Sequence, residues 1–153
     1  MCRPNGSSWW ALALALLAAI SLPAAAEKAS ARFTVSASVL ARVSLLAVDP
    51  PTLLTISGAD ITRGYKDVSA RYDVRQNTGR GYLLSLTPRL GPASRVAVLG
   101  LDSPIELNDQ SVEIYRNRPG GLERLVLTFR FVLEATARPG SYAWPVLVTA
   151  SPL

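Results

Sequence analysis

The sequence predicts an all-β protein, because apolar and polar residues alternate along much of its length. Alternation is the period of a half-buried strand, whose side chains point in turn to the core and to solvent. The pattern is clearest over residues 33–45, 125–133 and 142–150. No stretch after residue 27 sustains the 3.6-residue period of an amphipathic helix, and turn-forming glycines, prolines and asparagines recur between the alternating stretches.

The start of the chain has the three parts of an export signal. A positive charge at Arg3 precedes an apolar run from Ala11 to Ile20, and Pro23 is followed by three alanines that suit a signal peptidase. The apolar run is shorter than the ~20 residues that span a bilayer. We therefore expect residues 1–26 to be a cleaved signal peptide, and residues 27–153 to form one exported β-sandwich domain without a membrane span.

The composition excludes several kinds of catalytic and metal site. The chain has no histidine, and its single cysteine, Cys2, lies in the expected signal peptide. Ser-His-Asp and Cys-His nucleophilic sites and imidazole or thiolate metal sites are therefore absent from the mature chain. The acidic residues mostly alternate with apolar ones or lie in turns, which is typical of a solvated face. We expect no catalytic residue, no metal site and no cofactor, and a carboxylate-dependent hydrolase is the least favoured hypothesis.

The basic residues are dispersed. The chain after residue 26 has fifteen basic and eleven acidic residues, a net charge of +4, and thirteen of the fifteen are arginines that occur mostly singly. A nucleic-acid-binding protein more often gathers them in a stripe or on one helix. We therefore expect no nucleic-acid partner.

The first expected strand is unusually long. Residues 33–45 place on one face Phe33, Val35, Ala37, Val39, Ala41, Val43 and Leu45. Asp49-Pro50-Pro51 then ends the strand, since proline donates no ladder hydrogen bond. Thirteen residues exceed the usual strand of ~5–6. That length would let one segment serve both as an extension and as a strand of its own domain.

Shorter strands are expected in the middle of the chain, at residues 52–57, 71–76, 81–87, 95–99, 105–107 and 112–115. Residues 71–76 and 81–87 are separated by a short loop that contains Gly79, and we expect them to pair as a hairpin.

The last two strands should share a core. Residues 125–133 alternate, Arg138-Pro139-Gly140 is a strong turn signal, and residues 142–150 alternate again. Pro145 lies inside the last strand, which favours an edge strand or a bulge. Seven or eight short strands in about 127 residues suggest an immunoglobulin-like antiparallel β-sandwich, with an antiparallel barrel as the alternative.

Three segments resemble a known family. The opening FTVSASVLARVSLLAVDPPTL is similar to the N-terminus of secreted fimbrial subunits assembled by the alternate chaperone–usher route. The close LTFRFVLEATARPGSYAWPVLVTASPL resembles the final hairpin of those pilins and of spore-coat-U-like secreted domains, in which a Pro/Ala-Gly-x-Tyr turn leads into a strand. The middle YDVRQNTGRGYLLSLTP is similar to their Asn-containing hairpin. The chain departs from the relatives in lacking a cysteine pair and in ending with Ser151-Pro152-Leu153.

The resemblance implies an incomplete immunoglobulin-like fold, completed by a donor strand from a periplasmic chaperone or a neighbouring subunit. On this interpretation the donor-strand residues are Phe33, Val35, Ala37 and Val39, and the acceptor groove is lined by Tyr142, Trp144, Val146 and Val148. The protein would be a pilus subunit, a structural protein of cell adhesion found in the periplasm, at the cell surface or in an extracellular fimbrium. A chaperone, an usher and other subunits would be its partners.

A second hypothesis stays open at this point. The domain could be a self-contained periplasmic or secreted β-sandwich that binds a carbohydrate or a protein ligand. In that case residues 33–45 pair within their own fold. The two hypotheses differ in whether this strand completes its own sandwich or that of a neighbour.

Overall fold

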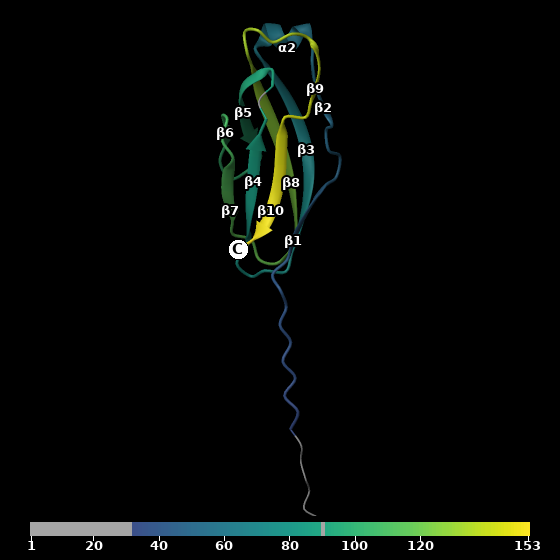
Figure 1. Cartoon of the computed structure of the whole chain (residues 1–153), viewed down its shortest axis with the longest axis vertical. Coiled ribbons are helices and arrows are strands. Elements are labelled where there is room, and N and C mark those ends of the chain that lie inside the picture. The colour runs from purple at the N-terminus through teal and green to yellow at the C-terminus, as the bar shows by residue number, and fades with distance from the viewer. Residues whose placement is uncertain (1–31, 90) are drawn as a thin grey trace, which may run out of the picture. The chain divides into compact units, whose positions relative to one another are not determined.

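Antiparallel strands and one short helix make up the chain over residues 32–89 and 91–153, which the computed structural model describes (Figure 1). The strands are β1 (Val43–Ala47), β2 (Leu53–Ile56), β3 (Tyr65–Gln76), β4 (Tyr82–Pro88), β5 (Ala93–Leu99), β6 (Ile105–Leu107), β7 (Val112–Arg116), β8 (Gly121–Leu133), β9 (Gly140–Ala143) and β10 (Val146–Pro152), and the helix is α2 (Gly58–Arg63). By its internal contacts the chain divides into Met1–Ala37 and Ser38–Leu153, and all these elements belong to the second unit. The expected signal peptide lies outside the described residues.

The strands form two main sheets, which pack together as a sandwich-like arrangement. One sheet has the order β1-β3-β8-β5-β6 and the other has the order β10-β4-β7, while β2 and β9 form a separate pair. Every pair is antiparallel, and the longest runs for twelve residues between β3 and β8. In Figure 1 the three-stranded sheet faces the viewer and the five-stranded sheet lies behind it. The expectation of an all-β, antiparallel sandwich is confirmed at this level.

The core lies between the two sheets and consists of the side chains that the alternation selected. The five-stranded sheet contributes Tyr72, Val74, Val96, Val98, Leu125, Leu127, Phe129 and Phe131, and the three-stranded sheet contributes Tyr82, Leu84, Leu86, Val146 and Val148. Burying one such aliphatic or aromatic side chain contributes about 1.5–3 kcal/mol. Alternation therefore correctly predicts which face of β3, β4, β8 and β10 is buried.

The expected hairpin of residues 71–76 and 81–87 is wrong. β3 pairs with β1 and β8, whereas β4 pairs with β10 and β7, so the intervening loop crosses from one sheet to the other. The Thr78 hydroxyl donates to the Gly81 carbonyl at 2.6 Å and ties this crossing together. Gly81 has φ +89°, and a Cβ there would lie 2.0 Å from the Arg116 carbonyl oxygen, so a larger residue would not fit.

The expected final hairpin is also corrected. β8 pairs with β3 and β5, and residues 142–150 lie elsewhere, divided between β9, which pairs with β2, and β10, which pairs with β4. Pro145 falls between β9 and β10, and β10 is at the edge of its sheet. The prediction of an edge strand or an irregularity at Pro145 is therefore confirmed.

The long first strand is shorter than expected. Only Val43–Ala47 forms a strand, and residues 32–42 form none in the described part of the chain. β1 pairs with β3 from Val43, opposite Gln76, and Gln76 is the last residue of β3. Because β3 ends there, the residues before Val43 have no strand beside them in this sheet.

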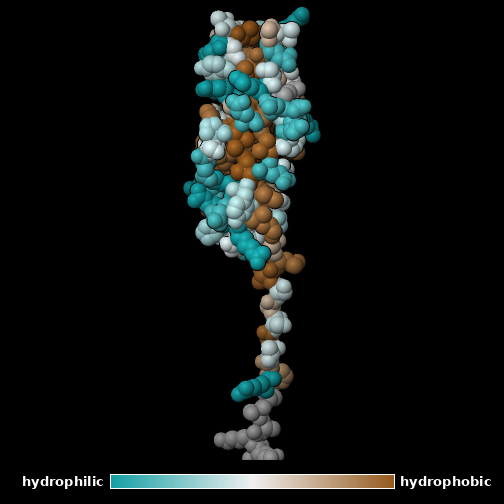
Figure 2. Space-filling model, turned by 90° about the vertical axis from the view of Figure 1, so that its left-hand side faces the viewer, coloured by the Kyte–Doolittle hydropathy of each residue, from teal (hydrophilic) through white to brown (hydrophobic). Residues whose placement is uncertain are grey.

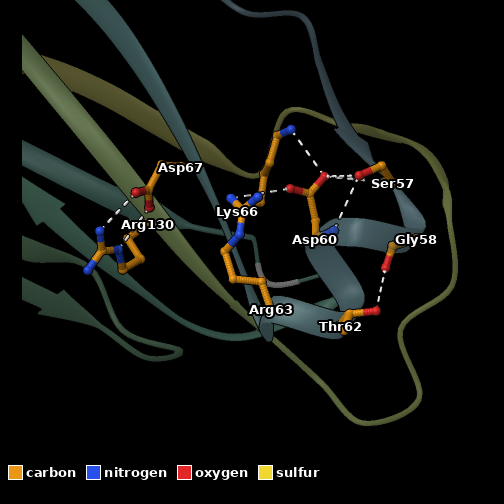
Figure 3. Close-up of polar contacts among 8 residues, drawn as sticks. All are labelled: Ser57, Gly58, Asp60, Thr62, Arg63, Lys66, Asp67 and Arg130. Atoms are coloured by element: carbon orange, nitrogen blue, oxygen red, sulfur yellow. Dashed lines mark hydrogen bonds and ion pairs between the residues drawn. The ribbon is translucent and has the colours of Figure 1, made fainter.

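A six-residue helix, α2, follows β2 and is closed at both ends by side-chain and backbone hydrogen bonds. Ser57 caps it: its hydroxyl accepts from the Asp60 amide at 3.3 Å, and its own amide donates to the Asp60 carboxylate at 2.9 Å (Figure 3). Gly64, with φ 82°, ends the helix by donating to the Asp60 and Ile61 carbonyls. A helix this short has too few residues to show a period, but Ser57-x-x-Asp60 is a capping signal in the sequence.

Candidate functional site: the free edge of β10

β10 has one edge without a strand partner in the described part of the chain. It pairs with β4 alone and is the longest edge strand of the two main sheets, with seven residues. No charged side chain occurs from Pro139 to Leu153. Natural edge strands are usually blunted by charges, by shortness or by bulges, because an open edge invites pairing with another chain. Apart from the prolines near its two ends, Pro145 and Pro152, β10 lacks these protections.

The edge strands on the other side of the sandwich differ. β6 has three residues and carries Glu106, and β7 carries Glu113 and Arg116. Figure 2 shows the side with β5, β6 and β7, where an apolar strip runs between hydrophilic margins. The half-buried apolar residues of this region are Leu101, Ile105, Val112 and Ile114. Charged side chains and the three-residue length of β6 thus blunt the edges on this side, whereas β1 and β10 carry no charged side chain.

The four residues expected to line the groove fall into two groups. Tyr142 belongs to β9, which pairs with β2 along one edge, and the Trp144 amide donates to the Thr52 carbonyl at 3.1 Å. Val146 and Val148 belong to β10, beyond the point where that pairing stops. Only the second group therefore lies along the free edge.

Tyr142 and Trp144 have structural contacts instead. The Trp144 ring packs edge-on against Phe129 and Phe131, with ring centroids 5.4 Å apart in each case. The Tyr142 hydroxyl donates to the Arg138 carbonyl at 2.8 Å. Such edge-to-face aromatic contacts add stability beyond the area they bury, so these residues anchor the segment that leads into β10.

Facing side chains of β1 and β10 form the margin of the core. Val146 and Val148 are 4% and 8% exposed, and Ala150, further along β10, is only half-buried. Cα atoms of β1 come within 8 Å of β10. The inward-facing residues of β1 are all half-buried: Val43, Leu45 and Ala47. The core residues on this side are therefore only partly covered, as are those beside β6 and β7.

The expected donor residues are strongly exposed. Phe33, Val35 and Val39 are 90%, 91% and 80% exposed, and Ala37 is exposed too. The first two and Ala37 belong to the unit Met1–Ala37, and Val39 belongs to the sandwich unit. Isolated exposed hydrophobic residues are normal on a soluble protein, but an alternating series of them is an unpaired strand pattern.

Several acidic residues serve as caps or ion-pair partners. The Asp60 carboxylate accepts from the Ser57 hydroxyl at 2.6 Å and from Lys66 at 3.1 Å (Figure 3), which together with the Ser57 amide lowers its pKa from 3.8 to about 2. Arg130 donates two hydrogen bonds to Asp67, at 2.9 and 2.8 Å, and these lower the pKa of that carboxyl group.

A third cluster joins the two sheets. The buried guanidinium of Arg116, on β7, donates to Glu123 of β8 at 2.7 Å and to Asp102 at 2.8 Å. The Tyr82 hydroxyl, on β4, donates to the same Glu123 at 2.8 Å. Burial raises the pKa of Tyr82, and this hydrogen bond raises it further. Within residues 32–89 and 91–153 there is no group of three potential metal ligands and no helix long and apolar enough to cross a membrane.

Comparison with protein-family models and with curated proteins finds no match for this chain. The free edge of β10 and the exposed alternating segment are therefore the basis for a functional proposal.

Proposed function

We propose that this protein is an exported, non-catalytic structural subunit that assembles by β-strand addition, with residues 33–39 of one copy adding to β10 of the next. The proposal rests on two complementary features of the described part of the chain, each of which lacks a strand partner. β10 offers a free, uncharged edge of seven residues, and residues 33–39 offer seven alternating residues that form no strand. Seven residues span about 23 Å in a strand.

The physical gain from such an addition has two sources. Backbone hydrogen bonds would satisfy the open edge of β10, and alternate side chains would enter the sandwich margin. Burial of Phe33, Val35 and Val39 would contribute about 1.5–3 kcal/mol each. The half-buried side chains on the receiving side are apolar, which suits these residues.

The strand order supports an immunoglobulin-like interpretation of the fold. In the three-stranded sheet β10 is both the last described strand and an edge strand. A donor strand beside β10 would extend this sheet over the inner face of β1. On this proposal, a periplasmic chaperone, an usher and neighbouring subunits are the partners, and the assembled form is a pilus-like surface fibre.

The self-contained binding module is the less favoured alternative. It needs residues 33–45 to pair within their own fold, but only Val43–Ala47 does so. It also leaves the exposed alternation of residues 33–39 without a purpose. Strand addition accounts for both halves of the long alternating run.

Two substitutions on opposite faces of residues 33–39 test the proposal. Val35→Asp would carry an unpaired charge into an apolar groove, where nothing compensates it. Ser36→Asp lies on the opposite face of the strand and serves as the matched control. We expect Val35→Asp to abolish assembly in size-exclusion chromatography while its melting temperature as a monomer stays unchanged, and Ser36→Asp to assemble normally. Unfolding of the Val35→Asp monomer would support the self-contained module instead.

A further inference from the structure

Asn77 holds the main chain immediately before β1. Its side-chain oxygen accepts from the Arg42 amide at 2.7 Å, and its side-chain amide donates to the Leu40 carbonyl at 2.8 Å. Its backbone amide donates to the Arg42 carbonyl at 3.2 Å. All three residues belong to the sandwich unit.

These three bonds continue the ladder after the strands have ended. The β1–β3 pairing stops at Val43 and Gln76, and Asn77 is the next residue after β3. One Asn side chain thereby satisfies two main-chain groups that would otherwise lie beyond the sheet. The main chain of residues 40–42 is fixed at both ends, and we call this arrangement the Asn77 clamp.

The clamp lies beside the end of β10. A surface hollow of about 290 Å³ is lined by Val39, Ala41, residues 77–80 and Leu153, and Leu153 directly follows β10. In Figure 1 the arrowhead of β10 lies at the same end of the sandwich as β1. Residues 40–42, to which the preceding segment is joined, therefore lie near the end of β10.

This attachment point allows a competing reaction. A donor segment joined to residues 40–42 could fold back and fill the edge of its own domain, and the copy would then be unable to accept a neighbour. To lie along β10, residues 33–39 would have to reverse direction relative to β1. A reversal needs a turn of about four residues, and residues 40–42 are the only residues between the segment 33–39 and β1.

We propose that the Asn77 clamp prevents this self-addition and so reserves residues 33–39 for another copy. The inference rests on the strand-addition function proposed above. The turn required for self-addition would break the bonds from Asn77 to Leu40 and Arg42, so the clamp disfavours the closed monomer. Removing the Asn77 side chain is expected to shift the equilibrium between open and self-added monomer about tenfold toward the self-added form, which corresponds to 1.4 kcal/mol.

The test uses the exported protein and a fluorescent peptide with the sequence of residues 32–40. At a concentration below assembly, we expect the wild-type monomer to bind the peptide. We expect Asn77→Ala to bind it more weakly, because its own segment occupies the edge in a larger fraction of the molecules, and the loss is smaller than the tenfold shift in the self-addition equilibrium. Adding Val35→Asp to Asn77→Ala should restore peptide binding, since the self-added segment no longer fits. A merely structural role for Asn77 would not produce this restoration. Asn108→Ala, an exposed residue of the β6–β7 turn, is the control and should match wild type.

The outcomes separate the two proposals. Equal peptide binding by wild type and Asn77→Ala overturns the clamp and leaves strand addition intact. Weak binding that Val35→Asp does not restore also overturns the clamp. Failure of the wild-type monomer to bind any peptide overturns strand addition itself. If Asn77→Ala melts at a much lower temperature, Asn77→Asp replaces it: the acceptor for Arg42 remains, the donor to Leu40 is lost, and a smaller loss of peptide binding in the same direction is expected.

Discussion

At the scale of single residues, Asp60 shows how a polar side chain serves the fold. The Ser57 hydroxyl, the Ser57 amide and Lys66 all donate to its carboxylate, and these bonds favour the charged form. Its pKa is lowered from 3.8 to about 2. A depressed carboxyl pKa stabilises the fold above the unfolded value, and this contribution is lost as the pH falls through the folded value.

We therefore expect the melting temperature of wild type to fall between pH 4 and pH 2, the interval between the two pKa values of Asp60. Asp60→Asn removes the titrating group and should flatten that part of the profile, while lowering stability at neutral pH. Asp109→Asn, in the exposed β6–β7 turn, is the control and should follow wild type. Thermal melts from pH 2 to pH 6 provide the measurement. A variant profile as steep as that of wild type would contradict this role of Asp60.

The sequence predicts well which individual side chains are buried. Tyr72, Leu84 and Phe129 each lie on the apolar face of an alternating stretch, and each is buried. Asn77 was not identified as a functional residue, because its contacts depend on where β1 and β3 end. No local pattern reports that endpoint.

At the scale of elements, β10 is the part of the structure on which the proposal depends. Ala150 is half-buried on its inward face, and Thr149 is exposed on its outward face. A lysine at position 150 would place a charge where a donor strand adds, although in the monomer its long stem can bring the ammonium group to water.

We expect Ala150→Lys to reduce assembly more than tenfold, a loss of more than about 1.4 kcal/mol, with little change in the melting temperature of the monomer. Thr149→Lys is the matched control and should assemble like wild type. Analytical ultracentrifugation of both variants measures the effect. Normal assembly of Ala150→Lys would show that strand addition does not use this edge.

The sequence did not predict correctly which strands pair with one another. Alternation identified β3, β4, β8 and β10, yet both expected hairpins were wrong. The period of a strand specifies which side chains face the core, but two strands on opposite sheets bury their faces against the same core and give the same pattern. The sequence also did not indicate that only Val43–Ala47 of residues 33–45 forms a strand. The alternating pattern continues beyond the point where the partner strand, β3, ends.

At the scale of the whole molecule, the two sides of the sandwich are treated differently. The strands β6 and β7, which carry charged side chains, border one side, and the uncharged strands β1 and β10 border the other. The hydrogen bonds of Arg116 and Tyr82 to Glu123, and of Arg116 to Asp102, link both sheets near the side of β6 and β7. This asymmetry would direct a neighbouring chain to β10 and away from β7.

Amide hydrogen exchange on the assembled protein and on the Val35→Asp monomer tests strand addition at β10 most directly. The account predicts that roughly half of the β10 amides, those that point away from β4, exchange rapidly in the monomer and become protected on assembly, because neighbouring amides of a strand point to opposite edges. Amides of β7 should exchange equally in both forms. Unchanged exchange of the amides of residues 146–151, with new protection at β6 or β7 instead, would contradict the account.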